Sequence, residues 1–148
     1  MSTPFAMLLW AAGAMSPACE LHVQDPWIRA APPAAQVMGG FASLHNPGDT
    51  PVRVTAASSP AFGRVELHEM RMDGDVMQMR KLDAIEVPAG ASVDLAPGAL
   101  HLMLFDPITA LPEGASAELT LTLDCGASVQ ATLPVRAAPV DMGHDHAH

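Results

Sequence analysis

The chain has 148 residues, of which 49% are hydrophobic and 16% charged, a length and balance that suit one domain with a single core. Its 16 acidic residues against 7 basic ones give a net charge of -9, which argues against nucleic acid or an anionic membrane surface as a partner. The 11 glycines and 14 prolines favour short strands and tight turns over helices.

Residues 1–18 carry no charged side chain and contain an apolar run from Phe5 to Ala14. The stretch ends in a small-x-small sequence directly before Cys19, which is typical of a secretory signal peptide. The apolar run is too short to cross a membrane, which takes about 20 residues, so we expect no transmembrane segment in the mature chain. We therefore predict a signal peptide over 1–18, a folded domain over 19–138, and a periplasmic location.

Cys19 and Cys125 are the two cysteines of the chain. In an oxidising compartment they could form a disulfide. Cys19 could instead carry a lipid anchor after signal cleavage, or both thiols could stay free, and the sequence does not place their Cα atoms within bridging distance. No C-x-x-C motif is present, which argues against thiol exchange chemistry.

Beyond Cys19 the chain shows short runs of alternating apolar and polar residues separated by Gly, Pro, Asn and Asp. Their spacing predicts an all-β domain, an antiparallel Greek-key β-sandwich. The segments predicted as strands are 20–30, 39–46, 51–57, 64–72, 75–82, 92–95, 99–105, 116–124 and 127–135.

Asp73-Gly74 is a strong two-residue hairpin signal between two of these strands. With those two residues as the loop, His68 is expected to face Met79 directly. Opposed residues on one face of an antiparallel pair have Cβ atoms about 4.5 to 5.5 Å apart, close enough for both side chains to reach one ion. Met70 is expected on the same face as His68.

The strand at 99–105 alternates in the same way, with Leu100, Leu102 and Leu104 on one face and His101 and Met103 on the other. If the leucines fill the core, the His/Met face points outward, which predicts a shallow and accessible site. Two imidazoles and two thioethers form a neutral, soft ligand set that suits Cu(I). The alternative is that the methionines are flexible core filler and the histidines ordinary surface residues.

Enzyme motifs are missing, so we expect no catalytic activity. His68-Glu69 begins like the zinc-protease motif H-E-x-x-H, but Met72 stands where the second histidine belongs. The sequence contains no G-x-S-x-G, phosphate-binding loop or dinucleotide fingerprint. An electron-transfer cupredoxin would need a cysteine ligand near its histidines, which Cys125 does not provide in sequence.

The C-terminal segment 139–148 ends in DMGHDHAH and is predicted to be a flexible, metal-attracting tail. Its three histidines are His144, His146 and His148. Nitrogen and oxygen donors suit Cu(II) better than a His/Met site does, so this tail is a candidate accessory Cu(II) site. The alternative is a solvated polar terminus.

His68, Met79, His101 and Met103 are spaced as His-x10-Met-x21-His-x-Met. This pattern resembles the signature of the periplasmic PCu(A)C-type copper chaperones. Four further segments also resemble that family, namely DPWIRAAPP at 25–33, GGFASLHNPGD at 39–49, SSPAFGRVELHEM at 58–70 and PGALHLML at 97–104. The resemblance extends from about Val23 to about Val135. Some members have a methionine directly after the first histidine, where this chain has Glu69, and Met70 could replace it.

The resemblance implies a cupredoxin-like β-sandwich that binds one Cu(I) through His68, Met79, His101 and Met103. It also implies delivery of that copper to respiratory oxidases, chiefly to the dinuclear centre of subunit II, or to another periplasmic copper carrier. Two alternatives stay open. One is a protein that buffers copper without a dedicated oxidase partner, and the other is a domain without metal whose Met/His face binds a protein.

Overall fold

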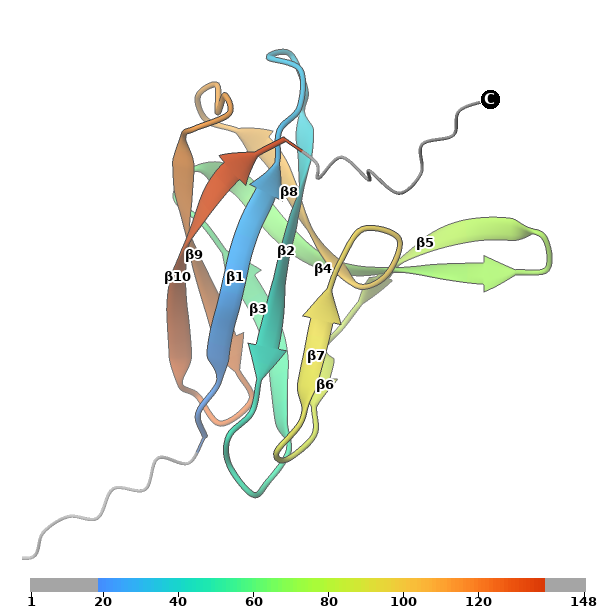
Figure 1. The fold of residues 1–148 in the computed structure, drawn as a ribbon, viewed down its shortest axis with the longest axis vertical. Coiled ribbons are helices and arrows are strands. Elements are labelled where there is room, and N and C mark those ends of the chain that lie inside the picture. Colours follow the sequence, from blue (N-terminus) through green and yellow to red (C-terminus); the bar gives the residue numbers. More distant parts are fainter. Residues whose placement is uncertain (1–18, 138–148) are drawn as a thin grey trace, which may run out of the picture.

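A computed structural model describes residues 19–137, which fold entirely as strands and loops, with no helix anywhere in that range. The order of the strands along the chain is shown in Figure 1. Their bounds are β1 His22–Arg29, β2 Val37–His45, β3 Val52–Ser58, β4 Phe62–Asp73, β5 Val76–Leu82, β6 Ile85–Val87, β7 Ser92–Leu95, β8 His101–Pro107, β9 Ser116–Leu123 and β10 Ser128–Arg136.

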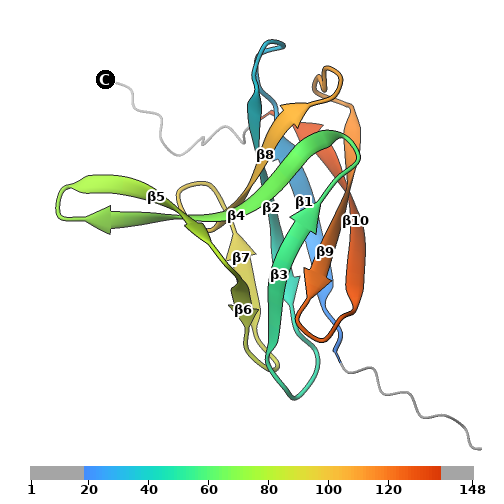
Figure 2. The same cartoon turned by 180° about the vertical axis from the view of Figure 1, so that it is seen from behind.

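The strands form one continuous sheet in the order β5-β4-β8-β2-β1-β10-β9-β3-β6, and β7 pairs with β2 outside this order. An additional pairing between β3 and β4 joins two distant members of this order, so the sheet closes on itself as a flattened barrel with two faces. β10, β1 and β2 lie in the layer nearest the viewer in Figure 1, and β9, β3 and β4 form the opposite layer, seen in Figure 2. The predicted all-β, cupredoxin-like sandwich is confirmed.

Two details differ from the prediction. β1 and β10 pair in parallel, with Ile28 beside Val135, whereas every other pairing between two of these strands is antiparallel. β6 was not predicted, because three residues are too few to establish a strand period. Its two apolar residues, Ile85 and Val87, are nevertheless buried, and Glu86 between them is exposed.

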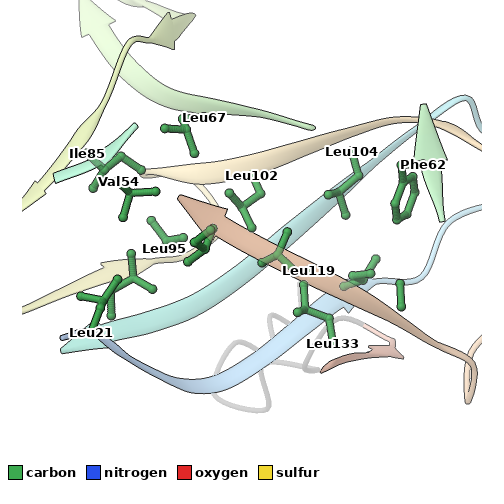
Figure 3. Close-up of a cluster of buried hydrophobic side chains, with 14 of the residues drawn as sticks. Leu21, Val54, Phe62, Leu67, Ile85, Leu95, Leu102, Leu104, Leu119 and Leu133 are labelled. Atoms are coloured by element: carbon green, nitrogen blue, oxygen red, sulfur yellow. The ribbon is translucent and has the colours of Figure 1, made fainter. Parts of the chain in front are cut away.

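The core lies between the two layers and is almost entirely aliphatic. Alternation within strands fills it: Leu119, Leu121 and Leu123 of β9 are each no more than 3% exposed, and the threonines between them are partly buried. From β8, Leu102 and Leu104 point into the same cluster, where Figure 3 shows them near Leu67 and Phe62 respectively. At roughly 25 cal/mol per Å² of apolar surface, such burial is the main stabilising term of the fold.

Cys19, which precedes β1, is joined to Cys125 in the loop between β9 and β10 by a disulfide, with their Cα atoms 6.4 Å apart. The bond links residues 106 positions apart in sequence. It therefore fixes the start of the described chain to the end of the barrel at which β9 turns into β10. Residues 1–18 and 138–148, with the predicted signal peptide and histidine-rich tail, lie outside the described residues.

Candidate metal centre

The two histidines of the sequence pattern come together across the β4–β8 pairing. His68 and His101 are direct partners in the ladder, and their ring centroids are 5.9 Å apart. Leu67 and Leu102, the next pair along, point into the core on the other side of the sheet. The alternation predicted for these strands is therefore confirmed, since the aliphatic side chains fill the core from the opposite face.

The β4–β5 hairpin has a different register from the one predicted. Asp73 pairs with Val76, so the two-residue loop is Gly74-Asp75, one position later than expected. Gly74 has φ +70° and Asp75 is not among the residues of positive φ, which fits a type II′ turn with glycine first rather than an Asp-Gly type I′ turn. The shift changes which side chains are directly opposed across the hairpin.

Met70, not His68, is the direct partner of Met79, and His68 is opposite Lys81. The expectation that His68 faces Met79 was therefore wrong. Because the partner moves by two residues, Met79 stays on the same face as His68 and lies diagonal to it. The face predicted for the site is unchanged, and Met70 has the place nearest to Met79.

A pocket of about 250 Å³ opens on this face. It gathers three methionines and one histidine of the predicted set, because β4, β5 and β8 all present these residues to it. Aromatic, glycine and arginine residues from β1, β2 and the β7–β8 loop complete its wall. The residues lining the pocket are Arg29, Gly39, Phe41, Met70, Met79, Pro97, Gly98, His101 and Met103.

His101 is buried, with 7% of its surface exposed, although the sequence predicted an outward-facing residue on an accessible rim. The ring centroid of Phe41 lies 6.4 Å and that of His68 5.9 Å from the ring centroid of His101. The Nδ1–H of His101 donates to the carbonyl oxygen of Ala99 at 2.9 Å. Since a carbonyl only accepts, this leaves the Nε2 lone pair of a neutral ring free.

His68 does not line the pocket but adjoins it through its contact with His101. Its Nε2–H donates to Glu66 Oε1 at 2.9 Å. Its Nδ1 atom is buried and has no hydrogen-bond partner. A buried nitrogen without a partner is costly for a protein, so an orphaned acceptor here indicates a place for a ligand that binds lone pairs.

Glu66 was not predicted as part of the site. Its hydrogen bond with His68, followed by one from Arg64 Nε at 2.9 Å, lowers the pKa of this carboxyl from 4.5 to about 2. Lys81 Nζ lies 4.0 Å from the same carboxylate. Glu66 is two residues before His68 on the same face of β4, and that spacing is the one sequence signal that could have identified it.

The methionines of the described chain differ widely in exposure. Met77 and Met79 are 47% and 48% exposed, so the interpretation of these two as core filler is wrong. Met70 and Met103 are partly buried in the pocket wall. Met38, by contrast, is a core methionine with 6% exposure.

A larger cavity, of about 500 Å³, lies between the β1–β2 and β8–β9 loops. Alanine and proline residues form most of its lining, together with Ile108 and Leu111. Glu113 is its one ionisable lining residue and Met38 its one thioether. Such a lining lacks the donors that a metal ion requires. Within residues 19–137, no three His, Cys, Asp or Glu side chains cluster as a metal site.

A family model described as "Putative lipoprotein LpqE-like" matches residues 21–135. The chain belongs to the LpqE-like family. This is the family of the PCuAC domains, which confirms the resemblance seen in the sequence. The LpqE-like chain is also 29% identical over 118 residues to "Putative lipoprotein Lxx21020" of Leifsonia xyli, covering 78% of its own length and 69% of that protein. It is 29% identical over 111 residues to uncharacterized protein RP573 of Rickettsia prowazekii, covering 70% of itself and 60% of that relative.

Solved structures agree with this assignment. The copper-bound PCuAC domain from PmoF2 has a TM-score of 0.67 at 27% identity, with 88% of this chain and 99% of that chain covered. The apo PCuAC domain from PmoF1 has a TM-score of 0.67 at 26% identity, with 79% and 93% covered. The solution structure of Cu(I)-DR1885 from Deinococcus radiodurans, 21% identical, shares the fold with a TM-score of 0.65 over 78% of this chain and 79% of that one. In the described part of the LpqE-like chain, no helix is long and apolar enough to span a membrane.

Proposed function

We propose that the chain is an exported, non-enzymatic copper chaperone that carries one Cu(I) at His68, Met79, His101 and Met103. The observation that carries this proposal is that thioethers lie beside two imidazoles that each have a free nitrogen, one lining the pocket and the other adjoining it. Membership of a family that includes a copper-bound PCuAC domain supports copper as the cargo. In this role the protein binds copper in order to transfer it, so copper is its cargo and not a resident cofactor.

The hydrogen bonds of both histidines support a role as metal ligands. Metal-binding histidines almost always donate their other ring N–H to a carboxylate or a backbone carbonyl, which fixes the tautomer and the ring orientation. His68 donates to the Glu66 carboxylate and His101 to the Ala99 carbonyl. His68 would therefore bind through Nδ1 and His101 through Nε2.

Ligand chemistry selects the oxidation state. Thioethers bind soft Cu(I) in preference to hard ions, and imidazole accepts copper in either state. All four proposed ligands are neutral, so the bound ion keeps its single positive charge beside the Glu66 carboxylate. Protons compete with copper for the imidazole nitrogens, so acidification favours release.

The arrangement also supports transfer. The two histidines provide a buried side of the site, whereas Met79 is about half exposed and lies at its outer side. A ligand from the acceptor protein could replace the thioether of Met79 first, before the buried histidines dissociate from the ion. We propose a copper-accepting oxidase subunit, or another periplasmic copper carrier, as the recipient. The predicted histidine-rich tail is proposed as an accessory Cu(II) site.

The deciding experiment is an anaerobic Cu(I) titration of the purified protein against a competing chelator, with a Met79→Leu/Met103→Leu double variant beside it. Tight one-to-one binding that is lost in the variant is the expected result. Met38→Leu is the control, since it removes a core thioether away from this pocket. Binding that is weak, or equally tight in the double variant, would refute the site and favour a domain that binds a protein instead.

Delivery needs a separate measurement. The copper-loaded protein would be mixed with the apo form of an oxidase subunit II fragment, and copper would be followed in both. Transfer supports the chaperone role. Retention of copper by the loaded protein would favour a copper-buffering role with the same ligands.

A further inference from the structure

Four methionines form a ladder along one face of the β4–β5 hairpin. Met70 is paired with Met79, and Met72 with Met77. Directly opposed side chains have Cβ atoms about 4.5 to 5.5 Å apart, and successive rungs on one face are separated by two residues, roughly 7 Å. We call Met70, Met72, Met77 and Met79 the methionine ladder.

The inner and outer rungs have different surroundings. Met70 and Met79 line the candidate pocket with His101 and Met103. Met72 and Met77 lie outside that lining, one rung farther along the hairpin, and are 59% and 47% exposed. In Figures 1 and 2 the hairpin projects as an arm away from the barrel, and β5 is a sheet edge that pairs with β4 alone.

The opposite face of the same arm is polar. There Glu69 is opposite Arg80, Arg71 is opposite Gln78, and Asp73 is opposite Val76. Exposed apolar side chains on an edge strand promote aggregation, and proteins usually place charges there. Between the inner rung and the loop, the charges of the arm lie on this opposite face only, and the first charged residue of β5 on the methionine face is Lys81, opposite His68 at the base of the hairpin. The methionine face is therefore free of charge along both rungs although no core packs against it.

Because thioethers are soft donors, two of them placed opposite each other fit Cu(I) and the related ion Ag(I). They offer few other interactions with a metal, since they carry no charge and are weak hydrogen-bond acceptors. Two donors from one rung would hold Cu(I) more weakly than the four-donor site of the pocket. A weak site one rung from a stronger one gives the ion a path to follow.

We propose that Met72 and Met77 form an outer Cu(I) station that captures the ion and passes it along the ladder into the pocket. This inference rests on the proposed function, because it takes the pocket as the destination. Each transfer breaks one Cu–S bond to Met72 or Met77 as one forms to Met70 or Met79. The copper stays Cu(I) throughout, so no electron is exchanged.

The test is an Ag(I) titration of protein labelled with ¹³C at the methionine methyl groups, followed by NMR. The first equivalent is expected to shift the methyl signals of Met79 and Met103, and the second those of Met72 and Met77. In a Met72→Leu/Met77→Leu variant the first response should be unchanged and the second lost. The same variant should take up Cu(I) from a Cu(I)–chelator complex several-fold more slowly, to the same final occupancy.

The matched control is Gln78→Leu, which adds an apolar side chain to the opposite face of the arm and leaves both rungs intact. It should keep both responses and the uptake rate.

If the second equivalent leaves the methyl signals of Met72 and Met77 unshifted while the first fills the pocket, the outer station is refuted and the proposed function stands. If neither equivalent shifts any methionine methyl, both fail. If the double variant loads copper as fast as the wild type, these methionines do not lie on the path, and protein contact becomes the better explanation of their exposure.

Discussion

His68 and His101 are direct neighbours across the β4–β8 ladder, with ring centroids 5.9 Å apart. Each ring donates one hydrogen bond to the residue two positions before it in the chain. His68 uses Nε2 and His101 uses Nδ1. The two rings are thus held in opposite tautomers when neutral, and each keeps one unshared lone pair. The predictions below follow from this pair and its neighbours.

Met79 has a nearby thioether that can replace it. Met70 is its direct partner and lines the same pocket. We expect Met79→Leu alone to weaken Cu(I) binding less than Met70→Leu/Met79→Leu, which removes both thioethers of the hairpin from the pocket. Competition titrations of Met70→Leu, Met79→Leu and the double variant measure their Cu(I) affinities. If the losses of binding free energy in the two single variants add up to the loss in the double variant, neither methionine substitutes for the other.

Glu66 orients His68, so its removal should weaken copper binding without removing a ligand. Losing the partner that holds a metal-binding histidine typically costs about 10- to 100-fold in metal affinity, and we expect Glu66→Ala to fall in this range. Glu66→Gln keeps an acceptor oxygen and should lose less. Glu69→Gln, on the opposite face of the same strand, is the control. Equal Cu(I) affinities for wild type and Glu66→Ala would contradict this role.

The same carboxylate predicts an acid dependence of stability in the copper-free protein. Its pKa is lowered from 4.5 to about 2 on folding, by His68 first and then Arg64. A carboxyl with a lowered folded pKa stabilises the fold above its unfolded pKa, and this contribution is lost as the pH falls through the folded pKa. The free energy of unfolding of wild type relative to Glu66→Gln should therefore be larger at pH 6 than at pH 2 (urea unfolding). A difference that does not change between pH 6 and pH 2 would be inconsistent with the lowered pKa.

The Cys19–Cys125 disulfide should stabilise the domain by restricting the unfolded chain. Removing a native disulfide from a small exported domain typically costs about 2–5 kcal/mol, and the bond here closes a loop of 106 residues. We expect Cys19→Ala/Cys125→Ala to lower the unfolding midpoint in urea and to leave the Cu(I) affinity unchanged, because neither cysteine lines the pocket. A loss of copper affinity in the fully folded double variant would contradict this separation.

The strands and the faces of their side chains could be predicted from the sequence because alternation is a local property. The leucines of β8 and β9 mark the buried face, and His101 and Met103 then belong to the other face without any knowledge of the fold. Strand bounds were less certain: β8 runs from His101 to Pro107, two residues later than predicted. The alternation was unaffected by this shift, since a face depends on parity rather than on where a strand begins.

The hairpin register could not be predicted because Asp73-Gly74 and Gly74-Asp75 are both acceptable two-residue loops. The choice between them depends on how β4 also pairs with β8 and β3, since one strand must satisfy all its partners. With Gly74 first in the turn, Met70 becomes the partner of Met79 and His68 that of Lys81. A single local signal therefore identified the hairpin but left each residue's partner two positions out of register.

By itself the sequence determined the all-β class, the face that carries the His and Met residues, and the family of the chain. Each of these depends on residue type and spacing, which tertiary contacts do not change. Only the tertiary structure decided that His68 is paired with His101, that Phe41 lies beside a buried His101, and that Glu66 accepts a hydrogen bond from His68. These contacts join strands far apart in sequence, or depend on which side-chain rotamers the packing allows. No local sequence pattern therefore predicts them.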